Sequence, residues 1–202
     1  MKRLKISSKN ISLAKKILGQ GGVLTVPTET VYGFSCNPYN EKAIKKIYQI
    51  KGRDFNKPLL LVADNFLTVK KYFKLNKLEK KLAEKYWPGA VTIILTLKHE
   101  NKKTLKHISK TINIAVRVSG NKIMRELANF CGGFITSTSA NISGGKECLS
   151  GRAVYQQFKN KKYQPDLILD SGKLKTKKPS TIIKVEGEEI KILRPGEIKI
   201  KI

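Results

Sequence analysis

The sequence has 202 residues, of which 40% are hydrophobic, and its formal net charge at pH 7 is +26. This length favours a single domain, residues 1–202, with a sizeable core, and no apolar run reaches the roughly 18 residues of a membrane-spanning helix. The first ten residues lack the apolar segment of a secretory signal, and the three cysteines form no CxxC pair. We therefore expect a cytoplasmic protein with no membrane segment and no structural zinc site.

Helix and strand patterns alternate along most of the chain. The predicted helices span residues 8–18, 41–50, 65–73, 78–86, 122–130 and 152–159. The predicted strands span residues 23–26, 59–63, 91–97, 112–118, 134–136 and 167–170, and residues 181–185 and 189–193 form a predicted late hairpin. This order predicts an α/β protein with a mixed sheet.

Several polar residues just before the predicted helices are expected to cap them, namely Ser8 or Asn10, Asn40, Asp64 and Ser119. Residues 98–110 and 171–179 are rich in lysine and are expected to be loops. The single tryptophan, Trp87, precedes Pro-Gly, and we expect it to be an anchor in the core.

The positive charge has two readings. A strongly basic chain can bind nucleic acid. However, the lysines are scattered over many segments, which indicates that most of them reflect the overall amino-acid composition of the chain and not a nucleic-acid site. Either way, the field attracts anions such as nucleotides and RNA.

Arginine is scarce in comparison, with six residues among 41 basic ones. A chain that uses lysine for general charge keeps arginine where a planar, bidentate donor is needed. Arg53, Arg117 and Arg194 lie in or beside motif-like segments, which fits the recognition of phosphate or carboxylate groups.

Three polar stretches each adjoin an apolar strand, and we predict that they form three walls of one site. They are GGFITSTSANISGG at 132–145, VPTETVYG at 26–33 and KGRDFNKP at 51–58. Hydroxyl and amide groups at strand ends suit hydrogen bonding to a polar small molecule. The alternative for each stretch is a simple surface loop or capping turn.

Several common chemistries lack their motifs. The chain has no GxxxxGK[ST], no GxGxxG after a strand, no GxSxG and no cluster of metal ligands. What remains is a cationic, hydroxyl-rich site without an evident nucleophile or general base. Such a site suits a reaction between bound substrates, in which positioning and charge neutralisation supply the catalysis.

Six ordered motifs resemble those of the YrdC-like family. They are VPTETVYG, KGR followed by KPL, WPGAVT, IAVRV, STSANISG, and PSTI with a late RPG, and together they cover about residues 21–196. The resemblance implies a twisted mixed sheet with surrounding helices and a large basic cavity. The short chain is similar to the short form of the family, which lacks a C-terminal domain.

The resemblance also implies an activity. L-Threonine, bicarbonate and ATP, with Mg²⁺ accompanying the ATP, give L-threonylcarbamoyladenylate and pyrophosphate. A separate tRNA-threonylcarbamoyl transferase complex then modifies adenosine 37 of tRNA. Whether the present protein itself contacts tRNA is left open by the sequence.

The family's KxR and SxN residues correspond to Lys51, Arg53, Ser139 and Asn141, the expected catalytic and ATP-binding set. The resemblance adds Lys57 and Arg194 as ATP contacts. It implies threonine contacts at Thr30, Arg117 and Ser137. Many long-form members carry a histidine where Val62 stands here, so threonine must be held without it.

Two alternatives come from other functional classes. One is a non-catalytic basic RNA-binding module, which would bind RNA in a salt-sensitive way and consume no ATP with threonine. The other is a carbamoyl-transfer domain of the hydrogenase-maturation type. That domain normally belongs to a much longer chain.

Overall fold

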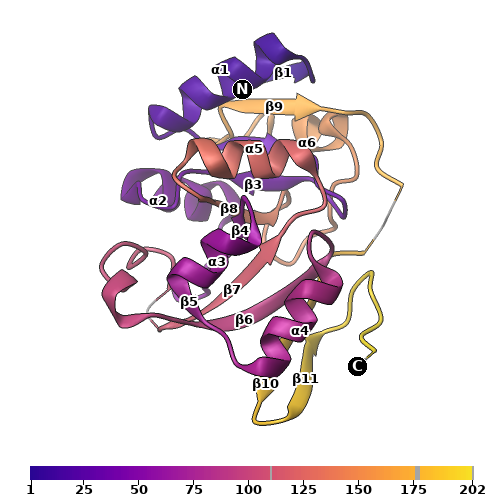
Figure 1. Cartoon of the computed structure of the whole chain (residues 1–202). Helices are drawn as coiled ribbons and strands as arrows, with labels where there is room; N and C mark the ends of the chain where they lie inside the picture. Colours follow the sequence, from indigo (N-terminus) through magenta and orange to yellow (C-terminus); the bar gives the residue numbers. More distant parts are fainter. Residues whose placement is uncertain (110, 176–177, 202) are drawn as a thin grey trace.

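A computed structural model describes residues 1–109, 111–175 and 178–201. Residue 110 of the predicted loop 98–110, residues 176 and 177 of the predicted loop 171–179, and residue 202 lie outside the described part. The described residues form an α/β structure with one mixed sheet of eleven strands (Figure 1). No helix in these ranges is long and apolar enough to cross a bilayer.

Six α-helices accompany the sheet in the described part of the chain. They are α1 (Ser8–Gly19), α2 (Glu41–Lys51), α3 (Phe66–Tyr72), α4 (Lys77–Tyr86), α5 (Lys122–Phe130) and α6 (Gly151–Phe158). A short 3-10 helix, η1, spans His99–Asn101 inside the predicted basic loop.

The strands are joined in the order β1-β9-β2-β3-β8-β4-β7-β6-β10-β11, with β5 paired to β6. Their bounds are β1 (Lys2–Lys5), β2 (Leu24–Val26), β3 (Gly33–Ser35), β4 (Leu60–Ala63), β5 (Phe73–Lys74), β6 (Val91–Leu97), β7 (Asn113–Val118), β8 (Phe134–Ser139), β9 (Leu167–Asp170), β10 (Thr181–Glu186) and β11 (Glu189–Arg194). Parallel pairs such as β4–β7 stand beside antiparallel pairs such as β4–β8, which makes the sheet mixed as expected.

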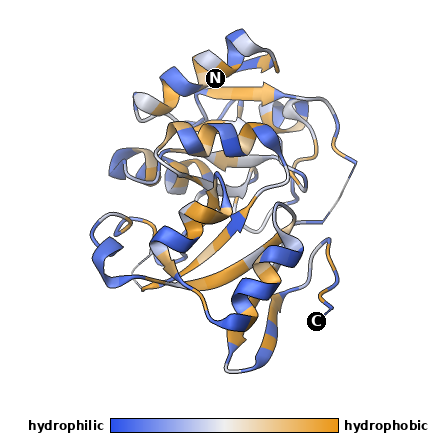
Figure 2. Ribbon diagram, viewed as in Figure 1, coloured by the Kyte–Doolittle hydropathy of each residue, from blue (hydrophilic) through white to orange (hydrophobic). Residues whose placement is uncertain are grey.

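The two faces of the sheet are covered by different helices. Successive strand residues point to opposite faces, so Leu61 and Ala63 join one core cluster while Val62 joins the other. The first cluster includes residues from α2, α3, α4 and α6, and the second includes residues from α1 and α5. Apolar residues accordingly line the sheet, while the helices carry polar outer faces (Figure 2).

Short polar side chains begin the helices, but not always the predicted ones. Asn40 caps α2 as expected, with its side chain accepting from the amide of Ala43. The other predicted caps were wrong by one to three residues. A cap is the residue with an extended backbone just before the first helical turn, and in each case a neighbouring polar residue occupies that position. The observed caps are Ser7 for α1, Asn65 for α3, Asn76 for α4, Asn121 for α5 and Ser150 for α6.

Several short elements were absent from the sequence prediction. β1 pairs in parallel with β9, far away in sequence, and β3 is only three residues long. The helix predicted to reach Phe73 ends at Tyr72, and Phe73 begins β5 instead. The strand predicted over 134–136 continues to Ser139 because it pairs with both β3 and β4. Trp87 is a core residue as expected, and its indole N–H donates to the carbonyl of Val91.

Candidate active site

A cavity of about 440 Å³ opens where the ends of several strands meet. All three predicted polar walls contribute to it. A fourth wall, which was not among the three predicted ones, comes from β6, β7 and the β10–β11 hairpin. The lining residues are Thr28, Thr30, Val31, Gly33, Arg53, Lys57, Pro58, Leu60, Ile94, Ala115, Arg117, Ser137, Thr138, Ser139, Glu147, Pro179, Ser180, Ile182, Leu193 and Arg194.

The cavity is cationic. In the part of the chain that the structure describes, three arginines and one lysine line it, and Glu147 supplies the one carboxylate. Burial raises the pKa of Glu147, while Arg194 and Lys51 act in the opposite direction. Burial also lowers the pKa of Arg194, which has Glu147 and Arg117 as charged neighbours. This arrangement suits an anionic ligand with more than one charged group.

Arg194 ends β11 and is held in place by the segment that precedes β10. Its Nε and Nη2 donate to the carbonyl of Ser180 at 3.1 and 2.8 Å, and Nη2 also reaches the Ser180 hydroxyl at 3.1 Å. That hydroxyl lies 2.9 Å from the hydroxyl of Thr92 on β6. The late RPG and the PSTI motifs are therefore one structural unit, although they are separated in sequence.

Gly196 explains the glycine in the RPG motif. A Cβ built there would lie 2.5 Å from both the Ser180 carbonyl carbon and the Thr181 amide, which are backbone atoms that cannot turn aside. We expect Gly196→Ala to lower the free energy of unfolding by about 1–3 kcal/mol through this overlap, measured by urea denaturation. Gly19→Ala is the control, because its nearest atom is a Phe130 side-chain carbon 4.0 Å away. Equal stability of the two variants would contradict this explanation.

The KxR and SxN residues are split between the cavity and a layer behind it. Arg53 and Ser139 line the cavity, whereas Lys51 and Asn141 are only 2% and 5% exposed and do not. The Lys51 ammonium donates to the carbonyls of Ser139 (2.5 Å) and Asn141 (2.8 Å) and to Asn141 Oδ1 (3.2 Å). Lys51 thus clamps the segment that follows β8.

Asn141 completes this clamp. Its Oδ1 accepts from the Ser139 hydroxyl at 2.6 Å, and its Nδ2 donates to the carbonyl of Gly145 at 2.5 Å. Burial, and then the charge of Arg53, lower the pKa of Lys51 to about 8.

Arg53 and Lys57 lie on the loop after α2. Arg53 donates to the carbonyls of Lys57 (3.4 Å) and Pro58 (3.1 Å), and the Tyr48 hydroxyl donates to the same Lys57 carbonyl at 2.8 Å. These bonds fold the loop so that Arg53 and Lys57 face the cavity.

The three residues predicted to contact threonine all line the cavity. Ser137 and Arg117 lie on β8 and β7, and Thr30 lies on the turn before β3. Val62 does not line the cavity, and its side chain is fully buried in the second core cluster. Its register partner across β4 and β7 is Arg117.

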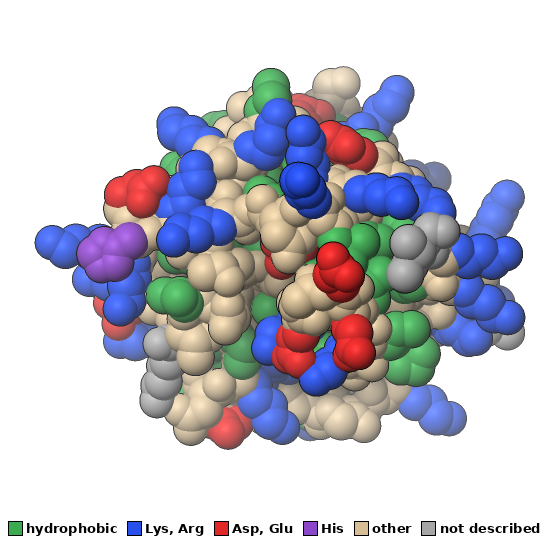
Figure 3. Space-filling view, turned by 60° about the horizontal axis from the view of Figure 1, so that its bottom comes forward, with side chains coloured by type: hydrophobic (Ala, Val, Ile, Leu, Met, Phe, Trp, Pro, Cys, Tyr) green, Lys and Arg blue, Asp and Glu red, His purple; other side chains and the backbone are tan. Residues whose placement is uncertain are grey.

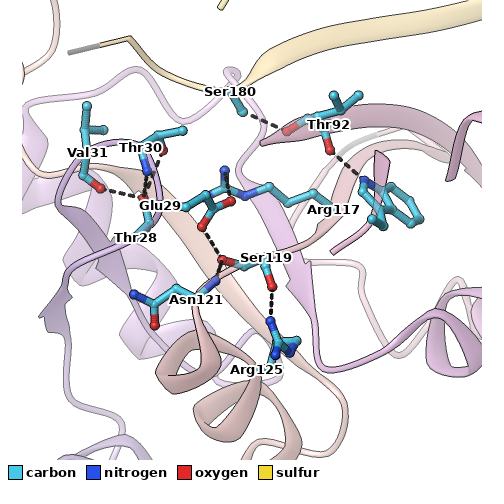
Figure 4. A network of polar contacts seen from close by, with 12 residues as sticks. Thr28, Glu29, Thr30, Val31, Thr92, Arg117, Ser119, Asn121, Arg125 and Ser180 are labelled. Atoms are coloured by element: carbon cyan, nitrogen blue, oxygen red, sulfur yellow. Dashed lines mark hydrogen bonds and ion pairs between the residues drawn. The ribbon is translucent and has the colours of Figure 1, made fainter. Parts of the chain in front are cut away.

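Three residues at the cavity or behind its wall had been missed as functional candidates. Glu147 follows the Gly-rich part of the 132–145 stretch, and Ser180 lies inside the PSTI motif. Glu29 lies between Thr28 and Thr30 and contacts Arg117 (Figure 4). The PSTI motif was a signal for Ser180, but neither glutamate had a partner that could be identified from sequence spacing.

No group of three or more His, Cys, Asp or Glu side chains that could hold a metal ion occurs in the described ranges. Lys and Arg side chains are spread widely over the face that Figure 3 shows, rather than gathered in one patch. This distribution agrees with the compositional reading of most of the lysines.

Comparison with known proteins gives the same family as the motifs. Residues 16–196 match the Sua5/YciO/YrdC family, which is described as telomere recombination. The chain is 39% identical over 193 residues to a putative threonylcarbamoyl-AMP synthase of Methanocaldococcus jannaschii, which covers 96% of this chain and 88% of that protein. It is 35% identical over 173 residues to a threonylcarbamoyl-AMP synthase of Buchnera aphidicola, with 84% and 95% covered.

The fold is also similar to that of P. abyssi Sua5 in its complex with L-threonine. The TM-score is 0.83 at 28% identity, and the match covers 96% of this chain but only 56% of the Sua5 chain. The present chain therefore spans little more than half of that relative. With a family match over most of its length and a 39% identical relative, the chain belongs to the Sua5/YciO/YrdC family.

Proposed function

We propose that this protein is a threonylcarbamoyl-AMP synthase that uses L-threonine, bicarbonate and ATP and releases pyrophosphate. The observation that carries the proposal is the cavity itself, where Arg53, Lys57, Arg117 and Arg194 face the hydroxyl groups of Ser137 and Ser139. The names of the two curated relatives support this activity. The product would serve a tRNA-threonylcarbamoyl transferase complex in the cytoplasm.

The proposed reaction joins two anionic partners. The threonine amine attacks bicarbonate to form a carbamate with loss of water, and a carbamate oxygen then attacks the α-phosphorus and displaces pyrophosphate. Because like charges repel at short range, cations must offset them. Arg53, Lys57 and Arg194 would neutralise the triphosphate, while the Ser139 hydroxyl would hydrogen bond to the nucleotide.

Lys51 and Asn141 would act from behind the wall by fixing Ser139. Their direct contact with ATP stays a prediction, since the contacts in this structure are to the chain itself. Arg117 would bind the threonine carboxylate, with Thr30 and Ser137 beside it. The similar structure of P. abyssi Sua5 is a complex with L-threonine, which supports L-threonine as a ligand of the present chain.

Mg²⁺ would enter with ATP rather than be held by a set of protein ligands. Magnesium in nucleotide sites is usually bound by substrate phosphates, water and one or two carboxylates. Among the described residues, Glu147 is the one carboxylate on the cavity lining, and it is compatible with such a role. Magnesium would add charge neutralisation at the phosphates.

The direct test is pyrophosphate release from ATP by the purified protein, with and without L-threonine and bicarbonate. We expect release to require both, and L-serine to be a much poorer substrate. Folded protein without release under these conditions would overturn the proposal. Salt-sensitive binding of tRNA would then favour the basic RNA-binding reading.

Arg53→Ala tests the assignment of the loop after α2. Loss of one charge-assisted contact typically costs about 1.5–3 kcal/mol, so turnover should fall roughly tenfold to a hundredfold with little change in melting temperature. Pyrophosphate release at saturating threonine measures it. Lys42→Ala on the outer side of α2 is the control, because it removes an exposed cation from the neighbouring helix. Wild-type turnover in Arg53→Ala would contradict the assignment.

A further inference from the structure

Glu29 lies at the centre of a polar network behind the cavity wall. Its neighbours Thr28 and Thr30 line the cavity, but Glu29 does not, and its side chain reaches toward β7 and the loop that follows it (Figure 4). A glutamate in that position, between two cavity residues, has no role in the functional assignments made so far.

Two partners hold the Glu29 carboxylate. Arg117 Nη1 lies 3.0 Å from Glu29 Oε1, and the Ser119 hydroxyl donates to Oε2 at 2.5 Å. The Arg117 side chain is 4% exposed and that of Glu29 is 19% exposed. This ion pair is therefore shielded from water, where a charge-assisted contact is stronger than at the surface.

The network continues into the start of α5. The Ser119 hydroxyl accepts from the amide of Asn121 at 3.2 Å, and the Ser119 carbonyl accepts from Arg125 Nη1 at 2.5 Å. Asn121 is the cap of α5 and Arg125 lies within that helix. The helix therefore fixes Ser119 through both its hydroxyl and its carbonyl. A rigid support of this kind holds the Glu29 carboxylate in one orientation.

The turn that carries Glu29 is also closed by local hydrogen bonds. The Thr28 hydroxyl donates to the carbonyl of Val31 at 2.7 Å and accepts from the amide of Thr30 at 3.0 Å. This pattern, in which a threonine side chain bonds its own turn, fixes the backbone on both sides of Glu29. The TET part of VPTETVYG thus presents two hydroxyls to the cavity and one carboxylate to Arg117.

The ion pair leaves part of the Arg117 guanidinium available. A guanidinium carries five N–H donors, and Glu29 is paired through Nη1. Among the described residues, the buried Nε of Arg117 has no hydrogen-bond partner. A buried donor without a partner is unfavourable. Arg117 also lines the cavity, so a carboxylate bound there would lie beside the N–H groups that Glu29 does not occupy.

From these contacts we infer that Glu29 is a positioning residue, which orients Arg117 so that its remaining N–H groups receive the carboxylate of the amino-acid substrate. This inference rests on the proposed function. Glu29 does not touch the substrate, and it acts through Arg117, with Ser119 holding Glu29 in turn. The consequence is selectivity for ligands with a free α-carboxylate.

The competing explanation is that Glu29 and Arg117 only join the β2–β3 turn to β7. Both explanations predict that removal of Glu29 lowers the melting temperature. They differ in the effect of Glu29→Gln on ligand preference, because loss of a purely structural ion pair would not change the ratio of affinities for L-threonine and L-threoninamide, which lacks the carboxylate charge.

The experiment compares binding of L-threonine and L-threoninamide to the full chain and to Glu29→Gln by calorimetry. We expect the wild type to bind L-threonine at least tenfold more tightly, and Glu29→Gln to lose most of this ratio through weaker L-threonine binding. The threonine KM should rise about tenfold to a hundredfold, with the KM for ATP nearly unchanged. Glu126→Gln is the matched control, since Glu126 is paired with Lys15 on the outer side of α5.

A second variant separates the contribution of the hydrogen bond that holds Glu29 from that of the Glu29 charge itself. Ser119→Ala removes the hydroxyl that holds Glu29 and that also accepts from the amide of Asn121, and it should reduce the same ratio by a smaller factor. Arg117→Lys should also lose the ratio, and adding Glu29→Gln to it should cause little further loss, because coupled residues are not additive.

Three outcomes would decide the matter. An unchanged ratio in folded Glu29→Gln, or L-threonine binding that becomes tighter, would overturn the inference. Additive losses in the double variant would overturn it as well. Failure of the proposed function is recognised separately, because the wild type would then show no threonine-dependent pyrophosphate release.

Discussion

Lys51→Met is expected to reduce pyrophosphate release about a thousandfold or more. The ammonium of Lys51 donates to three oxygens of Ser139 and Asn141, so its removal frees the segment that ends in the cavity wall. A displacement of about 1 Å in a positioning group can cost a hundredfold, and the lost positive charge beside the cavity adds to this. Steady-state pyrophosphate release at saturating ATP is the measurement.

The same variant should be less stable. Each buried acceptor left without a donor costs about 1–3 kcal/mol, which is partly offset because an ammonium no longer has to be buried. We expect a net loss of about 2 kcal/mol, or about 4–8 °C in melting temperature. Lys45→Met is the matched control, because Lys45 lies on the same helix and pairs with Glu41 on its surface. If Lys51→Met kept wild-type turnover, the clamp would have no role in activity.

The pH dependence of ATP binding tests the clamp in the wild-type protein, without a substitution. Because the pKa of Lys51 is about 8, the side chain loses a proton above that pH and keeps two N–H donors for three acceptors. ATP binding should therefore weaken as pH rises from 8 to 9.5, by up to about tenfold per unit. Lys51→Arg stays charged, so its ATP affinity should be flat over this range.

The free energy of unfolding should rise over the pH range in which ATP binding weakens. In the unfolded chain Lys51 keeps its proton up to about pH 10.5, so between pH 8 and 10.5 the unfolded state binds more protons than the folded one. The contribution of Lys51 to the free energy of unfolding then rises with pH. The stability difference between wild type and Lys51→Met should accordingly grow in favour of the wild type across this window.

The elements that were predicted well are those with a strong local signal. The helix 41–50 has an asparagine cap and apolar residues at helical spacing, and the late hairpin turns at Glu186-Gly187, where Gly187 has a φ of 63°. Such signals lie within about ten residues of one another. The three polar walls were also predicted, since each adjoins an apolar strand.

The missing parts depend on pairing between distant segments. β1 is a mostly exposed strand that exists because it pairs with β9, more than 160 residues later. Lys51 was expected to face ATP, but a position in sequence does not specify which oxygens a long side chain reaches. Glu29 looked like part of a polar turn because its partners, Arg117 and Ser119, come from another strand and loop.

Arg194→Lys is expected to reduce turnover about a hundredfold to a thousandfold, although it conserves the charge. Arg194 uses a planar fork to reach both the carbonyl and the hydroxyl of Ser180, and a lysine ammonium cannot reproduce that geometry. The variant would lose the bonds that fix the cation, and its contact with the triphosphate would be weakened as a result. Two charge-assisted contacts of about 1.5–3 kcal/mol each correspond to a loss of roughly a hundredfold to ten-thousandfold, and the charge that lysine retains places the expected loss in the lower part of that range.

The effect should appear in ATP affinity and not in threonine affinity, because Arg194 lies at the hairpin wall while Arg117 and Thr30 come from other elements. Titration of each substrate separately by calorimetry measures the two. Lys191→Ala is the matched control, since Lys191 lies on the same strand and pairs with Glu186 at the surface. If Arg194→Lys and Lys191→Ala bound ATP equally well, the fork would not be needed and the triphosphate would have to lie against Arg53 and Lys57 alone.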